Sequence, residues 1–374
     1  MKSIRLFSCL LFALAAFQLA AQTPTPRAIP RRSNIILIIA SDLAAGDLSC
    51  YGQTQFETPN LDKLAAQGIR FTNYTAGGLA SSPAHAALLI GKDTSPLPDA
   101  NYWLAPGDVT IAQILKNSGY YTGYIGEWNL GDQNSASAPW LKGFDEFAGY
   151  LTPEDAQNFY ADFAYRYFDK FDPLKNETTT FNRPETLFDN TGGQKGEYIP
   201  DSMTRWTANF IKSNQPKPYT HYRPFFLVVN YPVPGNGNHV VPTDAPYSEE
   251  SWPQPEKNRA AMISRLDDNI GGLLTYLDKM GMASNTVVFF TSDTTPKKVD
   301  GVDPKFFHEI PSTNDLHVPM IVRWKGGIPP GQVSGQKCSA RDFLPTAAEI
   351  AFIKPPDQID GKSFSPALFG EKPK

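Results

Sequence analysis

Continuous apolar runs alternate with amphipathic stretches along the chain. The runs are rich in β-branched and aromatic residues, as is typical of strands buried on both faces of a parallel sheet. They are residues 34–40, 225–230, 286–291 and 318–322. Apolar residues recur at helical spacing in residues 58–68, 109–118 and 262–280. This alternation predicts an α/β fold, a layered sandwich with a central, mostly parallel sheet flanked by helices, in which reacting groups follow the strands.

The first residues of the chain predict a secretory signal peptide, residues 1–21. Lys2 and Arg5 supply positive charge, and an apolar run then ends in small residues. The run is shorter than the roughly 20 apolar residues of a membrane span, and a buried helix is the other interpretation. Residues 22–33 contain prolines and arginines without an apolar period, which predicts a flexible lead-in. We expect a secreted or periplasmic protein with no membrane span after cleavage.

Composition narrows the classes of function. A chain of 374 residues, 41% of them hydrophobic, can bury one large core, or one core and a small lobe. The net charge is −4 and no basic run occurs, which argues against nucleic acid as a partner. Beyond the signal peptide only Cys50 and Cys338 remain. They could pair in an exported chain, or both could be buried as small apolar residues.

Residues 150–215 are set apart as a variable insertion rich in aromatic side chains. These side chains are Phe159, Tyr160, Phe163, Tyr165, Tyr167, Phe168 and Phe171. One interpretation is a helix that packs aromatic residues at mixed spacing. The other is a surface that stacks against carbohydrate.

Residues 75–91 carry the most informative motif of the chain, which reads TAGGLASSPAHAALLIG. It resembles the signature segment of sulfatases, in which Cys or Ser, followed by x-Pro-x-Arg, precedes a helix that reads AALLTG. In that family the Cys or Ser is oxidised to formylglycine, the hydrated aldehyde that attacks sulfur. Ser81 stands at the position of the nucleophile, and His85 stands at the position of the Arg.

Further segments match the same family in the family's order. They are residues 34–52, 58–71, 115–126, 143–147, 264–271, 285–293, 342–346 and 360–363. The chain therefore resembles sulfatases, within the alkaline phosphatase superfamily. The resemblance implies a sulfatase-like amino-terminal domain over residues 34–370, with a tail at residues 371–374. Family members usually continue into a smaller lobe that helps to close the substrate cleft, so we expect a poorly enclosed cleft here.

The resemblance also implies a divalent cation such as calcium. The family holds it with two adjacent Asp after the first strand and an Asp-Asn pair after a later one. At these positions the chain has Ser41-Asp42 and Asp293-Thr294. Such an ion takes oxygen ligands, and their charge sets its affinity, so the replacement of two of the four ligands weakens the site. Asp42 and Asp293 are either residual ligands or capping carboxylates at strand ends.

The family's cationic clamp on the sulfate and its leaving-group acid differ as well. The pattern GKWHLG reads GEWNLG here, so Glu127 replaces a Lys and Asn129 replaces a His. A carboxylate at Glu127 repels a sulfate ester where a cation would attract it. Losing one preorganised donor costs about 10²–10³ in rate, and losing a general acid or base about 10²–10⁴. These substitutions predict that ordinary sulfatase turnover is lost.

Other roles for these residues stay open at this point. Ser81 could become formylglycine, could act as an alkoxide nucleophile on a metal, or could cap the helix that begins near Pro83. Histidines could build a replacement metal site together with Asp42 and Asp293. These histidines are His85, His239, His308 and His317.

Two classes of function follow. The first is an exported pseudo-sulfatase that binds a sulfated or other glycan, or a protein partner, and needs no cation. The second is an active hydrolase of sulfate or phosphate esters with a rebuilt metal site, which requires a cation.

Overall fold

The computed structural model describes residues 32–95, 102–172, 175–217, 222–235, 240–296 and 316–370. Ten of the strands there form one sheet, in the order β11-β2-β10-β9-β1-β8-β4-β5-β6-β7, and β12 pairs with β3. The strands are β1 (Asn34–Ser41), β2 (Ile69–Phe71), β3 (Tyr74–Thr75), β4 (Tyr121–Glu127), β5 (Glu146–Tyr150), β6 (Phe163–Asp172), β7 (Glu177–Thr186), β8 (Phe225–Pro234), β9 (Thr286–Ser292), β10 (Met320–Arg323), β11 (Gln332–Ser334) and β12 (Cys338–Ser339).

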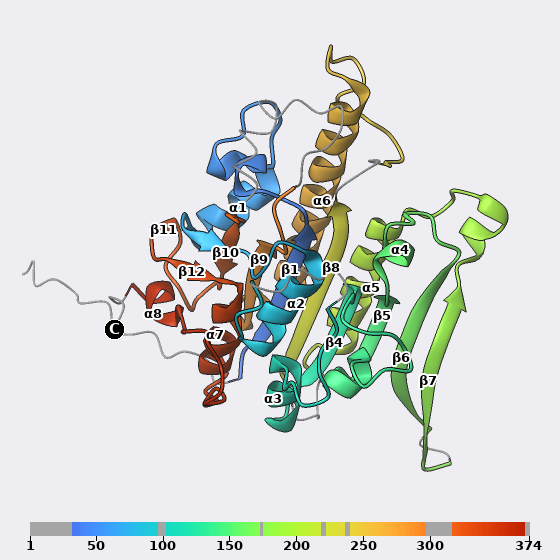
Figure 1. Ribbon diagram of the computed structural model, residues 1–374, viewed down its shortest axis with the longest axis vertical. Helices are drawn as coiled ribbons and strands as arrows, with labels where there is room; N and C mark the ends of the chain where they lie inside the picture. Colours follow the sequence, from blue (N-terminus) through green and yellow to red (C-terminus); the bar gives the residue numbers. More distant parts are fainter. Residues whose placement is uncertain are drawn as a thin grey trace, which may run out of the picture. The chain divides into compact units, whose positions relative to one another are not determined.

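Helices cover both faces of this sheet (Figure 1). On one face lie α1 (Pro59–Ala66), α5 (Ile199–Ser213) and α6 (Gln254–Lys279), which share a core with Ile36 and Ile38 of β1. On the other lie α2 (Ser81–Ile90), α3 (Ile111–Asn117) and α7 (Phe343–Ile350); Phe343 packs against aromatic rings of β8 and β9. The short helices are α4 (Pro153–Ala156), α8 (Ser365–Leu368), η1 (Ala45–Asp47), η2 (Ser49–Tyr51), η3 (Pro139–Lys142), η4 (Phe188–Gly193), η5 (Ala283–Asn285) and η6 (Ala340–Asp342).

The centre of the sheet confirms the predicted α/β sandwich. Strands β9, β1, β8, β4 and β5 run parallel to one another. Every residue of β1 is buried, because helices cover the sheet on both faces. The apolar run near residue 320 is different, since β10 is antiparallel to both β9 and β2. An apolar run records burial on two faces, but it carries no information about the direction of the strand.

The predicted helix in the aromatic-rich segment is wrong. Residues Phe163–Asp172 form strand β6, which is antiparallel to β5 and β7 and extends the sheet to its edge. Aromatic side chains fit a pleated, half-buried surface: Phe163 packs edge-on against Tyr150, and Phe168 stacks on Phe181. The boundaries of the insertion, residues 150–215, and its carbohydrate-stacking surface stay predictions.

Two further expectations concern cysteines and the ends of the chain. Cys50 and Cys338 are both free thiols, so they do not pair, and burial raises the pKa of each to about 12. Within the described ranges, no helix has both the length and the apolar character needed to cross a bilayer. The predicted signal peptide (residues 1–21), nearly all of the lead-in, His239, His308 and the tail (residues 371–374) lie outside the described residues.

Candidate functional site

The carboxyl ends of three parallel strands from the centre of the sheet bring the candidate residues together. Asp42 follows β1, Asp293 follows β9, and Glu127 ends β4. The register pairs Ala40 with Ser292, which sets the two aspartates side by side. Helix α2 begins at this edge and contributes Ser81 and His85. Parallel strands end at one edge of a sheet, so the prediction that chemistry would follow the strands located this cluster.

Asp293 lies at the centre of the cluster and is 1% exposed. Its Oδ1 accepts hydrogen bonds from the backbone N–H of Asp42, at 2.9 Å, and of Thr294, at 2.5 Å. The hydroxyl of Thr294 donates to Oδ1 of Asp42, and the hydroxyl of Ser41 donates to its Oδ2 at 3.4 Å. The two replaced positions therefore supply hydrogen-bond donors to the two carboxylates.

His85 faces Asp293 across the site. Its Nε2 lies 3.2 Å from Oδ2 of Asp293 and 3.1 Å from the side-chain nitrogen of Asn230, and the ring is 2% exposed. Burial lowers the pKa of His85, but the hydrogen bond and charge of Asp293 outweigh it and raise the pKa above its ordinary value. Burial likewise opposes the Asp293 carboxylate, but the His85 contact holds its pKa below the ordinary value. The two groups form a buried ion pair.

Glu127 is the third buried acidic residue near this pair, and it is 3% exposed. Burial raises its pKa to about 7; the imidazole of His85 opposes the shift, and the charges of Asp293 and Asp42 add to it. Its backbone carbonyl accepts hydrogen bonds from Tyr124 Oη at 2.6 Å and from the Asn230 side chain at 2.7 Å. Two side chains thus fix the backbone at Glu127.

Two site residues adopt a backbone conformation that residues other than glycine rarely take. Asp42 has φ 56° and Asn129 has φ 52°, both in the left-handed region, where Asp and Asn are the best tolerated residues after Gly. Asn129 is 6% exposed and donates its backbone N–H to the carbonyl of Leu151 at 3.2 Å. Such strain concentrates at functional sites.

Ser81 does not cap helix α2. The residue in the capping position is Ala80, which offers no side-chain hydrogen bond, and Ser81 is the first helical residue. The Ser81 side chain instead acts on Asp293 and helps to lower the pKa of that carboxylate. The capping interpretation assumed a later start of the helix, whereas Pro83 lies in its first turn.

Comparison with known proteins settles the family. The Sulfatase family model matches residues 33–353. Human arylsulfatase A is 30% identical and matches 92% of this chain over 69% of its own length. The chain belongs to the sulfatase family. An N-acetylgalactosamine-6-O-sulfatase of Bacteroides thetaiotaomicron is 29% identical over 81% of this chain and 69% of its own length.

Solved structures agree on the fold. The structure of Ps i-CgsB in complex with k-i-k-neocarrahexaose superposes with a TM-score of 0.70 at 26% identity, covering 90% of this chain and 76% of that one. The phosphonate monoester hydrolase of Agrobacterium radiobacter shares the fold, with a TM-score of 0.62 at 19% identity over 92% of this chain and 78% of that one. The sulfatase-family fold, within the alkaline phosphatase superfamily, therefore extends over the sheet and the helices on both its faces.

The donor set in this chain does not fit the divalent cation that sulfatases usually hold. Calcium takes six to eight oxygen ligands. All four carboxylate oxygens of Asp42 and Asp293 already face hydrogen-bond donors or the imidazole of His85. Among the described residues, no group of three or more His, Cys, Asp or Glu side chains could hold a metal ion.

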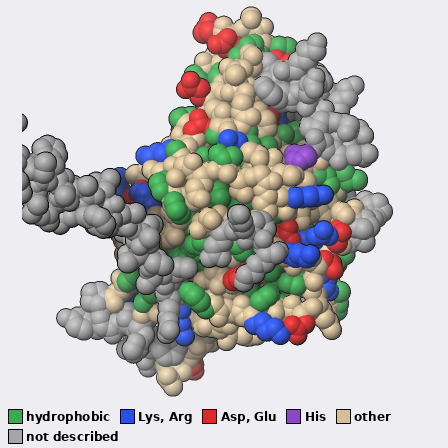
Figure 2. All heavy atoms as spheres, turned by 90° about the vertical axis from the view of Figure 1, so that its left-hand side faces the viewer, with side chains coloured by type: hydrophobic (Ala, Val, Ile, Leu, Met, Phe, Trp, Pro, Cys, Tyr) green, Lys and Arg blue, Asp and Glu red, His purple; other side chains and the backbone are tan. Residues whose placement is uncertain are grey.

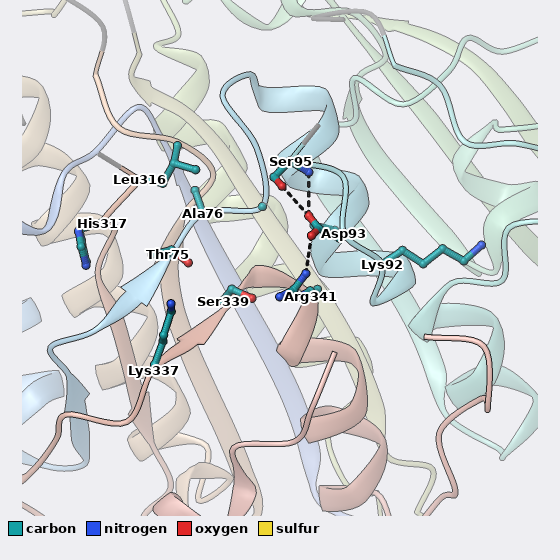
Figure 3. A pocket seen from close by; sticks show the side chains of 12 residues that line it. Thr75, Ala76, Lys92, Asp93, Ser95, Leu316, His317, Lys337, Ser339 and Arg341 are labelled. Atoms are coloured by element: carbon teal, nitrogen blue, oxygen red, sulfur yellow. Dashed lines mark hydrogen bonds and ion pairs between the residues drawn. The ribbon is translucent and has the colours of Figure 1, made fainter. Parts of the chain in front are cut away.

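His317 does not join the site. It is exposed, and it lines a different cavity of about 470 Å³ (Figure 3), so the replacement metal site predicted from the histidines does not include it. That cavity is basic, but Arg341 pairs with Asp93 at 2.6 Å and Lys92 pairs with Asp108 at 3.1 Å. On the face shown in Figure 2, basic and acidic side chains are likewise interspersed.

Three polar residues of the site were not identified from the sequence. Asn230 contacts His85 from the middle of β8, and its position as a polar residue within a buried strand was an available signal. Arg259 of α6 is 1% exposed and pairs with Asp47 at 3.0 Å, and it donates to the backbone carbonyl of Asp42 at 3.0 Å. Nothing in the local pattern marks this pair, because its partners are 212 positions apart.

Proposed function

We propose that this chain is an exported sulfatase-family protein that binds a glycan or a protein partner without hydrolysing sulfate esters. The observation that carries the proposal is the ion pair between His85 and Asp293, at 3.2 Å. His85 stands where the family pattern has an Arg, and its imidazole pairs with Asp293. In the family, the carboxylate at the position of Asp293 binds the cation. Cation-assisted attack on a sulfate ester lacks its usual basis here.

The charge of the site supports the same proposal. Asp42, Asp293 and Glu127 are buried within it, and His85 is the cationic side chain that faces them. Two like charges 4 Å apart repel by about 4 kcal/mol at an effective dielectric constant of 20. A sulfate ester anion would therefore be opposed where an active sulfatase attracts it.

Binding of a ligand without turnover is consistent with a chain that keeps the sulfatase-family fold but has other residues at the catalytic positions. The relatives are named as sulfatases, several of them for amino sugars, which makes a glycan the first class of ligand to examine. A protein partner, including an active relative, is the other class. Export rests on the predicted signal peptide and is tested by sequencing the amino terminus of the mature protein.

The test is sulfate release by purified mature protein. The substrates are 4-nitrophenyl sulfate, N-acetylgalactosamine-6-sulfate and N-acetylglucosamine-6-sulfate, each with chelator, with calcium and with zinc. We expect no release above that of a Ser81→Ala control under any condition. Intact mass of the mature protein shows in parallel whether Ser81 carries the mass of a serine or of formylglycine.

Cation-dependent release that disappears in Ser81→Ala would contradict the proposal. It would favour the alternative, an active hydrolase with a rebuilt metal site. Phosphate esters are included in the panel, because the same fold occurs in a phosphonate monoester hydrolase.

A further inference from the structure

A second cavity opens beside Asn129. Its volume is about 440 Å³, in the range of small-molecule sites. Three chain segments line it: the segment with Trp103, the loop after β4, and the start of α4. Backbone hydrogen bonds join them, from Leu104 N–H to the carbonyl of Leu130 and from Asn129 N–H to the carbonyl of Leu151, both at 3.2 Å. The walls of the cavity are therefore tied to one another.

Two side chains that line this cavity are available to a ligand: Trp103 for ring stacking and Asn129 for hydrogen bonds. Trp103 is 49% exposed, and the ring contacts known for the described residues do not include it. Asn129 is 6% exposed, and its side-chain amide has no hydrogen-bond partner among the residues that the structure describes. The amide of Asn129 lines the cavity and is not among the buried polar atoms that lack a partner, so it faces the open space of the cavity, where it can pair with a ligand that has both donors and acceptors.

The charged groups of the cavity are acidic. Asp132 and Glu154 line it, and no Lys, Arg or His is among the described lining residues. The charge of Glu154 also contributes to the raised pKa of Glu127, so the cavity and the carboxylates of the former catalytic site lie within electrostatic reach of each other. A carboxylate accepts hydrogen bonds but cannot donate them.

We propose that this cavity binds an uncharged sugar residue, a ligand class that rests on the proposed function and deepens it. The apolar face of a pyranose packs on the exposed indole of Trp103. Its hydroxyls donate to Asp132 and Glu154 and pair with the amide of Asn129. A sulfated sugar instead presents negative oxygens that only accept, so the carboxylates repel it. The ligand chemistry therefore resembles the desulfated form of what an active sulfatase takes.

The test uses mature protein and a panel of oligosaccharides in matched pairs, each as the sulfated chain and after chemical desulfation. κ-Neocarrahexaose, chondroitin and heparan fragments are included, together with neutral galactose and N-acetylglucosamine oligomers. Calorimetry measures Kd, and sulfate release is measured in the same samples. We expect binding of at least one uncharged glycan, and roughly tenfold weaker binding of its sulfated counterpart.

Variants separate the cavity from the rest of the surface. Trp103→Ala should weaken the uncharged ligand by roughly tenfold, and Asn129→Gly, which tolerates the left-handed backbone, should weaken it by several-fold. Phe188→Ala is the matched control, because this side chain is an exposed aromatic (78%) outside the cavity, and it should leave Kd unchanged. Glu154→Gln should raise the affinity for the sulfated counterpart relative to the uncharged one. Circular dichroism confirms that each variant is folded.

Three outcomes would overturn the inference: no uncharged glycan of the panel binds, Trp103→Ala binds as well as wild type, or the sulfated member of each pair binds more tightly. Failure of the proposed function is a different result, namely sulfate release. Glycan binding through Trp103 together with sulfate release would leave the cavity established and the lack of turnover refuted.

Discussion

Two buried ion pairs flank Asp42, and they differ in how their charge depends on pH. On one side Arg259 pairs with Asp47 and donates to the carbonyl of Asp42, at 3.0 Å in each case. On the other side Asp293 accepts from the N–H of Asp42 and pairs with His85. A guanidinium stays charged at every working pH, whereas an imidazole titrates. The first pair fixes the backbone after β1 regardless of conditions, and the second makes the interior of the site depend on protonation.

Removing the guanidinium tests the first pair and has the largest expected effect. Arg259→Met leaves the carboxylate of Asp47, which is fully buried, without its cation. Breaking a buried pair in this way costs about 3–5 kcal/mol of the free energy of unfolding, measured by urea denaturation. The same substitution at Arg265 is the matched control, because Arg265 lies on the same helix as Arg259 and its pair with Asp201 of α5 is partly exposed. There we expect a loss of about 0–1 kcal/mol.

Equal losses in the two variants would contradict the contrast between a buried and an exposed pair. The comparison is close because both arginines lie on α6 and both pair with an Asp. Differences in helix propensity therefore cancel.

The sequence and the structure agree where the signal is local and repeated. The apolar runs predicted β1, β8 and β9, and the rule that reacting groups follow parallel strands pointed to the positions of Asp42 and Asp293. The motif placed Ser81 and His85 on one helix. Direction was beyond this reasoning: nothing in an apolar run distinguishes the antiparallel β10 from its parallel neighbours.

Side-chain partners were also beyond it. The sequence records that Thr294 replaces an Asn, but not that its hydroxyl donates to Asp42. It records that His85 replaces an Arg, but not that the ring faces Asp293. Contacts between positions roughly two hundred residues apart depend on the three-dimensional arrangement of strands and helices. The aromatic segment was predicted to be a helix because Phe168 interrupts the alternation of aromatic residues in strand β6 and obscures the period of two.

The pH dependence of stability tests the second pair and its neighbour Glu127. Burial raises the pKa of Glu127 from 4.5 to about 7, so between these values the folded protein keeps a proton that the unfolded chain has lost. The free energy of unfolding then falls as pH rises, by at most about 1.4 kcal/mol per pH unit for one group. The raised pKa of His85 acts in the same direction above 6.5. The lowered pKa of Asp293 acts in the opposite direction, below 3.8, outside this window.

Glu127→Gln should flatten this slope between about pH 4.5 and 7, because it removes the titrating carboxyl. Stability is measured by urea denaturation at half-unit intervals. Unchanged slopes in wild type and variant would mean that Glu127 titrates as it does in the unfolded chain.

The addition of calcium should have the smallest effect on stability of all these changes, and the lack of such an effect is informative. A ligand that binds only the folded state stabilises it by RT ln(1 + [L]/Kd), so a good site at millimolar calcium raises Tm by several degrees. In this protein the oxygens of Asp42 and Asp293 are taken up by donors and by His85, and we expect a change in Tm of less than about 1 °C. Sodium chloride of equal ionic strength controls for screening. A calcium-specific rise in Tm of several degrees would mean that the ion displaces His85 from Asp293. The ion pair would then occupy a working metal site only while calcium is absent.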